Sequence, residues 1–420
     1  MDSYKTMNDF IREQRSAKEI TALPLKDIRI IDLATVVAAP FAATLMSDFG
    51  AEVIKVESPK APDALRRWGV LEQGVQPFWA VFARNKFPIT INLKSPDGRK
   101  IFLNLVEKSD VLIENMRPGT MERLGFDVEK LLAVNPGLVI SRVSGYGQTG
   151  PYSSKPGFGT LAEGFSGFTY LNAQPGGVPT NAPLALADFI AGMHLAFAIM
   201  MALRGQVRGK SGGGEIDISL YEPMFGLFGA DFLTYVQTGE IPQPQGNELS
   251  YVAPRNNYLT KDGRWVTLSG ATQKPFERLM EITGHPEMNN DSRYKSNDER
   301  IKKENRRVIN QVISDWVASK NLDEILEICD RHGITVGPIC SMADIYKDVH
   351  YKERESYVEV EDPFHKTLLK IPNVPFRYSN APGRIRFPGL PYGSANEVIL
   401  HDLLEYSLEE IEKFKKSGAI

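Results

Sequence analysis

Asp188 is an acidic side chain at the start of the longest apolar run in the chain. The run covers residues 189–203, and its only polar side chain is that of His194. Aspartate is a favoured N-cap because its side chain accepts hydrogen bonds from the first helical N–H groups, and the helix dipole favours its charge. The same place suits a working carboxylate that is ionised, partly hydrated and aimed out of a rigid element. The stretch itself favours capping and leaves catalysis open.

Basic side chains gather in two further stretches that could bind an anion. The first is RNKFPITINLK, residues 84–94, and the second is RPGTMER, residues 117–123. Solvated surface charge is the ordinary interpretation of such clusters. The alternative is a site where these side chains meet the phosphates of a ligand. Lys86 and Arg117 are the candidates within the two clusters.

Several common kinds of site have no motif in this sequence. There is no G-x-S-x-G elbow between a strand and a helix and no Walker A motif, and no G-x-G-x-x-G follows the first predicted strand, which argues against a bound dinucleotide. The stretch KSGGGEI precedes a strand, so it predicts a tight turn. The six histidines are scattered without ligand spacing, and we therefore predict no metal site.

The elements that must position these residues alternate along the first half of the chain. Helices are predicted at residues 39–50 and 95–109, the second with Ser95 as N-cap and Pro96 in the first position. Strands are predicted at residues 28–34, 51–57, 87–93, 110–115, 137–145 and 215–222. Such alternation predicts an α/β fold, with a Rossmann-like parallel sheet covered by helices on both faces.

The character of the sequence changes near residue 235. A stretch rich in Pro, Gly, Gln and Asn predicts a linker, the Asp262-Gly263 pair predicts a hairpin turn, and two helix-patterned stretches follow. We therefore predict a smaller α+β domain. The predicted parts are an N-terminal extension (1–24), the large Rossmann-like domain (25–235), the linker and small domain (236–337), and a C-terminal part that returns to the large domain (338–420) and ends in a helix at 400–418.

Composition limits the class of protein. The 420 residues are 42% hydrophobic and 24% charged, with a net charge of −3, which argues against a general nucleic-acid or membrane-surface binder. Two cysteines make no disulfide framework, and the N-terminal stretch lacks a signal-peptide apolar core. The apolar run is shorter than the ~20 residues that span a bilayer, so we expect a core helix there. We expect a cytoplasmic protein with no nucleic-acid or membrane partner.

Four ordered blocks of the chain resemble one known family, the class III CoA-transferases, which includes formyl-CoA transferase, carnitine CoA-transferase and α-methylacyl-CoA racemase. The blocks are DLATVVAAPFAATLMSDFGAEVIKVESP, RNKFPITINLKSPDGR, DVLIENMRPGTMERLGFDVEKLLAVNPGLVISRVSGYGQTGPY and ALADFIAGMHLAFAIMMALRGQVRGKSGGGEIDISLYE. The resemblance covers most of residues 25–225. It implies a Rossmann-like large domain plus a small domain, and two interlocked subunits in a homodimer or a heteromer with a related subunit. It also implies acyl-CoA and free carboxylic acid as substrates, with no tightly bound cofactor.

The resemblance assigns roles to particular residues. Asp188 falls where the family has its catalytic aspartate, which implies attack on the acyl-CoA thioester, a mixed anhydride and then an aspartyl-CoA thioester. Arg123 matches an arginine that binds CoA phosphate, and Tyr146 matches an active-site tyrosine. Val37 stands where formyl-CoA transferase has a substrate-binding glutamine, which implies a roomier or more apolar acyl site. Succinyl-CoA is a common donor in this family.

Two alternatives to a transferase remain. The racemases of the family carry Gly-His-Asp where this chain has Gly157, Phe158 and Gly159. Racemisation needs two positioned acid–base groups, and His194, six residues after Asp188, should point away from it as a packed core residue. The other alternative is a non-catalytic partner subunit. The sequence therefore predicts a CoA-transferase with Asp188 as nucleophile.

Overall fold

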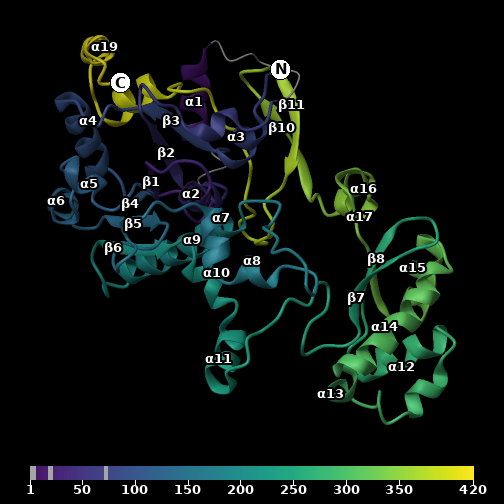
Figure 1. Ribbon diagram of the computed structural model, residues 1–420. Coiled ribbons are helices and arrows are strands. Elements are labelled where there is room, and N and C mark those ends of the chain that lie inside the picture. Colours follow the sequence, from purple (N-terminus) through teal and green to yellow (C-terminus); the bar gives the residue numbers. More distant parts are fainter. Residues whose placement is uncertain (1–5, 18–21, 71–73) are drawn as a thin grey trace. The chain divides into compact units, whose positions relative to one another are not determined.

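The structure, a computed structural model, describes residues 6–17, 22–70 and 74–420. The chain divides into two compact units (Figure 1). Unit 1 comprises Met1–Phe168, Asn181–Val236 and Glu353–Ile420, and unit 2 comprises Thr169–Thr180 and Gln237–Lys352. This division differs from the predicted domains because unit 2 takes in residues 169–180 and continues past residue 337. A hydrogen bond from Gly246 N to Ala173 O (2.9 Å) ties the added segment to the linker.

Unit 1 is built on a six-stranded sheet whose neighbouring strands are all parallel. The strand order is β3-β2-β1-β4-β5-β6. The strands are β1 (Arg29–Asp32), β2 (Glu52–Glu57), β3 (Lys86–Thr90), β4 (Val111–Glu114), β5 (Val139–Ser144) and β6 (Gly214–Ser219). The order reverses between β1 and β4, and ligands of open parallel sheets bind at the carboxyl ends of the strands at such a point. The predicted fold class is confirmed.

Helices cover both faces of this sheet (Figure 1). One face carries α2 (Ala38–Ser47), α7 (Gly159–Phe165) and α9 (Leu186–Val207), and the other carries α1 (Met7–Ser16), α4 (Pro96–Glu107), α6 (Val128–Val134) and α19 (Leu408–Ser417). Further helices are α3 (Pro77–Phe82), α5 (Thr120–Arg123), α8 (Phe168–Leu171), α10 (Glu222–Gly226), α11 (Gly229–Thr238) and α18 (Asn396–Val398). The predicted cap of α4 is confirmed, since Ser95 Oγ accepts the Gly98 N–H at 3.0 Å.

Successive residues of the central strands enter different cores, because side chains alternate across a strand. Ile30 packs with residues of α2 and α9, whereas Ile31 packs with residues of α4. Val111 and Leu112 divide in the same way on β4. Both faces are buried, so the strands read as unbroken apolar runs rather than alternating ones.

The predicted core helix, α9, is buried on one face only. Ala191 and Leu195 are buried, and a Cβ atom on Gly192 would lie 2.5 Å from Ala38 O of α2. Phe197 and Met201 on the outer face are 65% and 57% exposed. Within the described residues, α9 alone is long and apolar enough to cross a membrane, on length and composition only. Its inner face packs against α2 and the sheet.

The expectation that His194 is a packed core residue is wrong. His194 lies on the exposed face of α9, and its Nδ1 lies 2.8 Å from Ile190 O, one turn earlier in the same helix. The apolar sequence around it predicted burial, but only one side of the helix meets the sheet.

Unit 2 combines a small antiparallel sheet with helices. The sheet has the order β7-β8-β9, with β7 (Arg255–Leu259), β8 (Trp265–Ser269) and β9 (Thr335–Pro338). The helices are α12 (Gln273–Ile282), α13 (Asn297–Arg300), α14 (Lys303–Ala318), α15 (Leu322–Arg331), α16 (Met342–Lys347) and α17 (Val349–Glu353). The predicted hairpin is confirmed, because β7 and β8 pair on either side of Asp262-Gly263.

The chain then returns to unit 1 through the antiparallel pair β10 (Tyr357–Asp362) and β11 (Thr367–Pro372). The helix predicted at residues 400–418 is divided. A π-helical turn covers Ile399–Leu403, and α19 begins only after Ser407, whose side chain forms a capping box with Glu410. Gly418 ends the helix in the left-handed region, with φ of 70°.

Candidate active site

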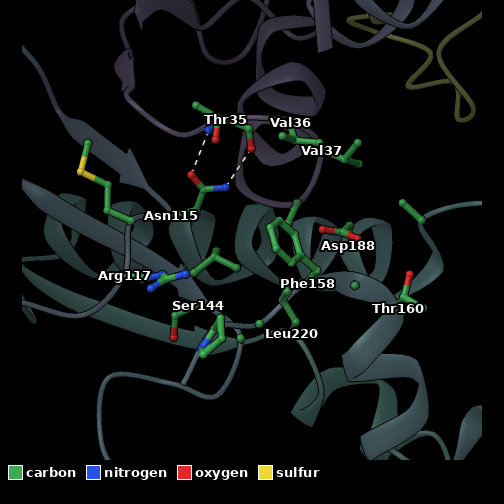
Figure 2. Close-up of a pocket in the computed structure, with 18 of the residues that line it drawn as sticks. Thr35, Val36, Val37, Asn115, Arg117, Ser144, Phe158, Thr160, Asp188 and Leu220 are labelled. Carbon is green, nitrogen blue, oxygen red and sulfur yellow. Dashed lines mark hydrogen bonds between the residues drawn. The ribbon is translucent and has the colours of Figure 1, made fainter. Parts of the chain in front are cut away.

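A cavity of about 650 Å³ opens at the carboxyl edge of the unit 1 sheet (Figure 2). Segments that follow neighbouring strands form its walls. They are residues 35–38 after β1, residues 115–118 after β4, residues 144–145 at the end of β5, and Leu220 after β6. Asp188 and the first residues of α7 complete the lining. The cavity therefore lies at the point where the strand order reverses.

Asp188 is in the first turn of α9, but it is not the helix cap. The N-cap position belongs to Ala185, whose side chain makes no capping bond, and α9 begins at Leu186. The capping prediction is therefore wrong, since the helix starts three residues earlier than the apolar run suggests. Without a capping role, the Asp188 carboxylate is directed to the cavity that it lines.

Burial and, after it, the charge of the nearby Glu163 carboxylate raise the pKa of Asp188 to about 6. A hydrogen bond to the backbone N–H of Asp188 itself acts in the opposite direction. Desolvation disfavours the charged form of a carboxyl group, and a second negative charge does the same. The group is thus mostly ionised at neutral pH but unusually basic for an aspartate.

Gly159 makes room for the Asp188 carboxylate. A Cβ atom built on Gly159 would lie 1.9 Å from Asp188 Oδ2, so no larger residue fits there without moving the carboxylate. The preceding residue, Phe158, is 73% exposed and lines the cavity near Asp188 (Figure 2). The site therefore places the aromatic ring of Phe158 and the backbone of Gly159, which has no side chain, next to the carboxylate.

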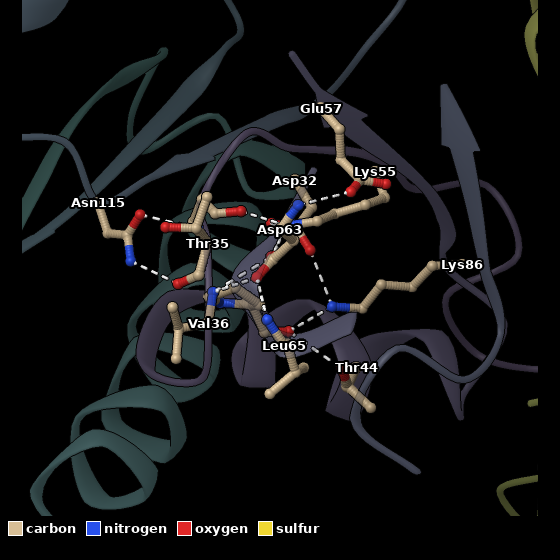
Figure 3. Close-up of polar contacts among 12 residues, drawn as sticks. Asp32, Thr35, Val36, Thr44, Lys55, Glu57, Asp63, Leu65, Lys86 and Asn115 are labelled. Atoms are coloured by element: carbon tan, nitrogen blue, oxygen red, sulfur yellow. Dashed lines mark hydrogen bonds and ion pairs between the residues drawn. The ribbon is translucent and has the colours of Figure 1, made fainter. Parts of the chain in front are cut away.

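The loop between β1 and α2 forms another wall of the cavity and is held in an unusual conformation. Val36 has φ of 67°, a left-handed conformation that is rare for a β-branched residue. The buried Asp63 carboxylate accepts the Val36 N–H at 3.1 and 3.2 Å and also the Leu65 N–H at 2.9 Å. Side-chain hydrogen bonds thus hold this loop against its own backbone preference (Figure 3).

A buried group of charges supports the same loop (Figure 3). Lys55 Nζ pairs with Asp63 at 3.0 Å and donates to Ala34 O, the carbonyl that precedes the loop. Asp32 lies between Lys55 (3.6 Å) and Lys86 (2.8 Å). Buried charges are tolerated when they are paired and hydrogen-bonded, and here the pairing connects three strands to the cavity wall.

Lys86, a predicted contact for phosphate, belongs to this buried group. It is 1% exposed, and its Nζ donates to Asp32 Oδ2 and to Pro40 O of α2 at 2.7 Å. The structure therefore gives Lys86 an internal role, and we do not include it among the residues available to a ligand.

The other predicted basic and aromatic residues lie in different places. Arg117 lines the cavity and is exposed. Arg123 is an exposed residue of α5 outside the lining, and its Nη2 donates to Thr120 Oγ1 at 2.8 Å. Tyr146 follows the lining residue Gly145 and packs edge-on against Phe165 at 5.4 Å. The structure thus brings Arg117 to the cavity with Asp188, and it leaves Arg123 and Tyr146 outside the lining.

Sequence reasoning missed several residues of the site. Asn115 Oδ1 accepts the Thr35 N–H at 2.9 Å, and its Nδ2 donates to Thr35 O at 2.8 Å, which joins the loops after β1 and β4. Lys155 is a second exposed cation of the lining. Asn115 could have been suspected, because it directly follows a predicted strand next to the reversal point. Lys155 lies in a turn-rich stretch that carries no signal of this kind.

Comparisons with known proteins agree with this arrangement. The profile of CoA-transferase family III matches residues 25–396. The alpha subunit of succinyl-CoA–L-malate CoA-transferase from Chloroflexus aurantiacus is 39% identical over 95% of this chain and 93% of its own length. The beta subunit is 37% identical over 95% of this chain and 99% of its own. A CAIB/BAIF family protein from Brucella suis, solved by crystallography, has a TM-score of 0.79 at 28% identity and covers 91% of this chain and 99% of its own. The chain belongs to CoA-transferase family III, and it is an enzyme that transfers CoA from an acyl-CoA to a carboxylic acid.

Proposed function

We propose that this enzyme takes CoA from succinyl-CoA, passes it to a dicarboxylic acid such as malate, and uses Asp188 as the covalent nucleophile. The position of Asp188 supports this assignment. Its carboxylate is half-buried and unusually basic, it belongs to the first turn of α9, and it lines the cavity where the strand order reverses. The choice of substrates is supported by the relatives that act on succinyl-CoA and L-malate.

In the proposed reaction, a carboxylate oxygen of Asp188 attacks the thioester carbonyl. The C–S bond breaks, and CoA leaves as a thiolate from a mixed succinyl–aspartyl anhydride. The thiolate then attacks the aspartyl carbonyl and expels succinate, which leaves an aspartyl-CoA thioester. The acceptor carboxylate attacks that thioester, and the released thiolate attacks the acceptor carbonyl and restores Asp188. Each exchange is easier than a direct one, and every bond change involves only carboxylates, the thioester and Asp188, so we propose no resident cofactor.

Two features of the cavity would bind negatively charged substrates and stabilise negatively charged intermediates. Arg117 and Lys155 are exposed cations of the lining, and both donor and acceptor in this proposal carry a second carboxylate, which a guanidinium or ammonium group binds. Ala38, the first residue of α2, also lines the cavity. The first N–H groups of a helix have no partner within the helix, so they can receive the negative charge that develops on the thioester oxygen.

The test is a transfer assay with succinyl-CoA and a panel of free acids: L-malate, glutarate, acetate and benzoate, with products identified by mass spectrometry. We expect succinate release and a new CoA thioester with a dicarboxylate. Asp188→Asn should abolish transfer and remain folded, because the neutral amide avoids the cost of burying a charge. Hydroxylamine added with succinyl-CoA should inactivate the enzyme and label the peptide that contains Asp188. A folded Asp188→Asn protein with near-normal turnover would remove Asp188 from the mechanism.

We further propose that the enzyme works in the cytoplasm and as an assembly of two subunits, either two copies or one copy with a related chain. The two related proteins named above are the alpha and beta subunits of one enzyme, which supports a paired arrangement. If the isolated chain is inactive in every assay, a pairing with a related subunit is the next preparation to test.

A further inference from the structure

Helices α7 and α9 meet at Asp188. Gly159, the first residue of α7, lies against the Asp188 carboxylate. Glu163 follows four residues later in the same helix, so it lies one turn further along the same face. Glu163 is only 2% exposed to solvent. A second carboxylate is therefore buried in the helix that contacts the proposed nucleophile.

Glu163 is also bonded to the segment that leads into α9. Its Oε2 accepts the backbone N–H of Ala182 at 3.2 Å. Ala182 lies three residues before Ala185, the N-cap of α9. Glu163 thus holds the chain just before the turn that carries Asp188, and it is not among the residues that line the cavity.

The other charged groups near Asp188 lie on the elements packed around it and on the cavity wall. Helix α2 carries no charged side chain between Ala38 and Ser47. Strand β5 carries Arg142, which is bound by Glu114, Glu122 and Glu215. Further charges are those of Asp217 on β6, Glu222 on α10, which accepts from Ser219, and Arg117 and Lys155 on the cavity wall.

We propose that Glu163 is a positioning residue for Asp188: it holds the segment that enters α9 and keeps a second negative charge next to the nucleophile, which makes Asp188 more reactive. The proposal rests on the proposed function, in which Asp188 attacks the thioester. A carboxylate that is poorly solvated and faces a like charge is more basic, and a more basic oxygen forms the new bond to carbon more readily. The pKa of Asp188 agrees, because burial is its largest cause and Glu163 is the one charged group that adds to the rise.

The test compares pH profiles of kcat/KM between pH 4.5 and 8.5. Glu163→Gln keeps an oxygen for the Ala182 N–H but removes the charge, so we expect the acidic limb to move to lower pH and the plateau value of kcat to fall. The Kd of CoA should not change, because Glu163 is not among the residues that line the cavity. Glu163→Asp keeps the charge and should keep the acidic limb in place. Glu129→Gln, the same change on the exposed surface of α6, is the matched control and should leave the profile unaltered.

The outcomes separate this inference from the proposed function. If Asp188→Asn abolishes transfer but Glu163→Gln leaves the acidic limb unmoved, the role of Glu163 is refuted and that of Asp188 stands. If Asp188→Asn is active, the proposed role of Asp188 as nucleophile is refuted, and the inference about Glu163 falls with it. Glu163→Met supplies a second neutral side chain of similar length, should Glu163→Gln not fold. Failure of both neutral variants to fold would assign Glu163 to the fold alone and would also contradict the proposal.

Discussion

The chemistry of the site depends on the ionisation of one carboxyl group, that of Asp188. Burial and, after it, Glu163 raise its pKa to about 6, and only the ionised form can attack a thioester. We therefore expect kcat/KM to be flat above pH 7 and to fall about tenfold per unit of pH well below pH 6. The sign follows from the direction of the shift, since an ordinary aspartate would stay ionised to pH 4. A pH–rate profile with succinyl-CoA measures this, and a flat profile down to pH 5 would contradict it.

Gly159 allows a second prediction at the same scale. In Gly159→Ala the new methyl group would stand 1.9 Å from Asp188 Oδ2, and the carboxylate must turn away to accommodate it. We expect kcat to fall by about a hundredfold, because small misplacements of reacting groups cost this much, while the fold and the Kd of CoA stay the same. Gly164→Ala lies on the same helix with nothing within 4 Å of the added atom, so it is the control. Equal activities of the two variants would show that Asp188 does not need this space.

Individual residues also show where reasoning from sequence succeeds and where it stops. The pattern around Asp188 predicts an N-cap, which is wrong, and the family resemblance alone implies a nucleophile there, which stays a prediction. Lys86 was assigned to a ligand because its stretch is basic, yet its partner Asp32 lies 54 positions away in sequence. That pairing exists only because β1, β2 and β3 are neighbours, and local sequence does not contain it. Glu163 escaped notice for the same reason, since its effect acts through a helix distant in sequence.

At the scale of elements, the loop between β1 and α2 is the part of the cavity wall that depends most on buried charge. Asp63 binds Lys55 and Leu65 N–H at buried positions and Val36 N–H at a partly buried one. Asp63→Ala would leave Lys55 and Lys86 sharing Asp32, and loss of one partner of a buried pair costs about 3–5 kcal/mol. We expect the free energy of unfolding, measured with urea, to fall by this amount.

Asp63 also caps the 3-10 turn Ala64–Arg67, whose Leu65 N–H it accepts. The control variant therefore changes another capping aspartate, one that is less buried. Asp127 caps α6 by accepting the Lys130 N–H at 2.8 Å, and Asp127→Ala should cost only about 1 kcal/mol. If the two variants lose the same stability, the buried charges contribute nothing beyond capping. If Asp63→Ala unfolds outright, Asp63→Asn keeps an acceptor for Val36 N–H and should show an intermediate loss.

Patterns in the sequence predicted elements well wherever an element is framed by local signals. Ser95 with Pro96 marked the start of α4, and Asp262-Gly263 marked a hairpin. The patterns failed where two elements share one continuous pattern. The pattern of residues 400–418 predicts one helix, but Ser407 interrupts it with a capping box that satisfies free N–H groups and begins a new helix. Helix boundaries near Asp188 failed similarly, because Leu186 and Ala187 extend the apolar run on the other side of the acid.

At the scale of the whole molecule, unit 1 exposes large apolar side chains of the kind that a second protein chain would cover. Helix α11 buries none of its own residues, and Phe232, Leu233 and Val236 on it are 52%, 54% and 61% exposed. The outer face of α9 adds Phe197 and Met201. Exposed apolar side chains that gather on a helix mark interaction sites on soluble proteins, and a second chain is the partner that we proposed above.

This surface leads to a prediction about assembly. The purified protein should sediment at twice its chain mass of 46.8 kDa or more, because burial of these side chains by a second chain stabilises by about 25 cal/mol for each Å² of apolar surface. Phe232→Asp combined with Leu233→Asp places two charges on α11 without disturbing the core, so sedimentation should report a smaller species. Phe364→Asp is the control, since Phe364 is 56% exposed in the turn between β10 and β11. A wild-type protein that sediments at the chain mass would show that α9 and α11 tolerate water, and the search for a partner would then turn to a different, related subunit.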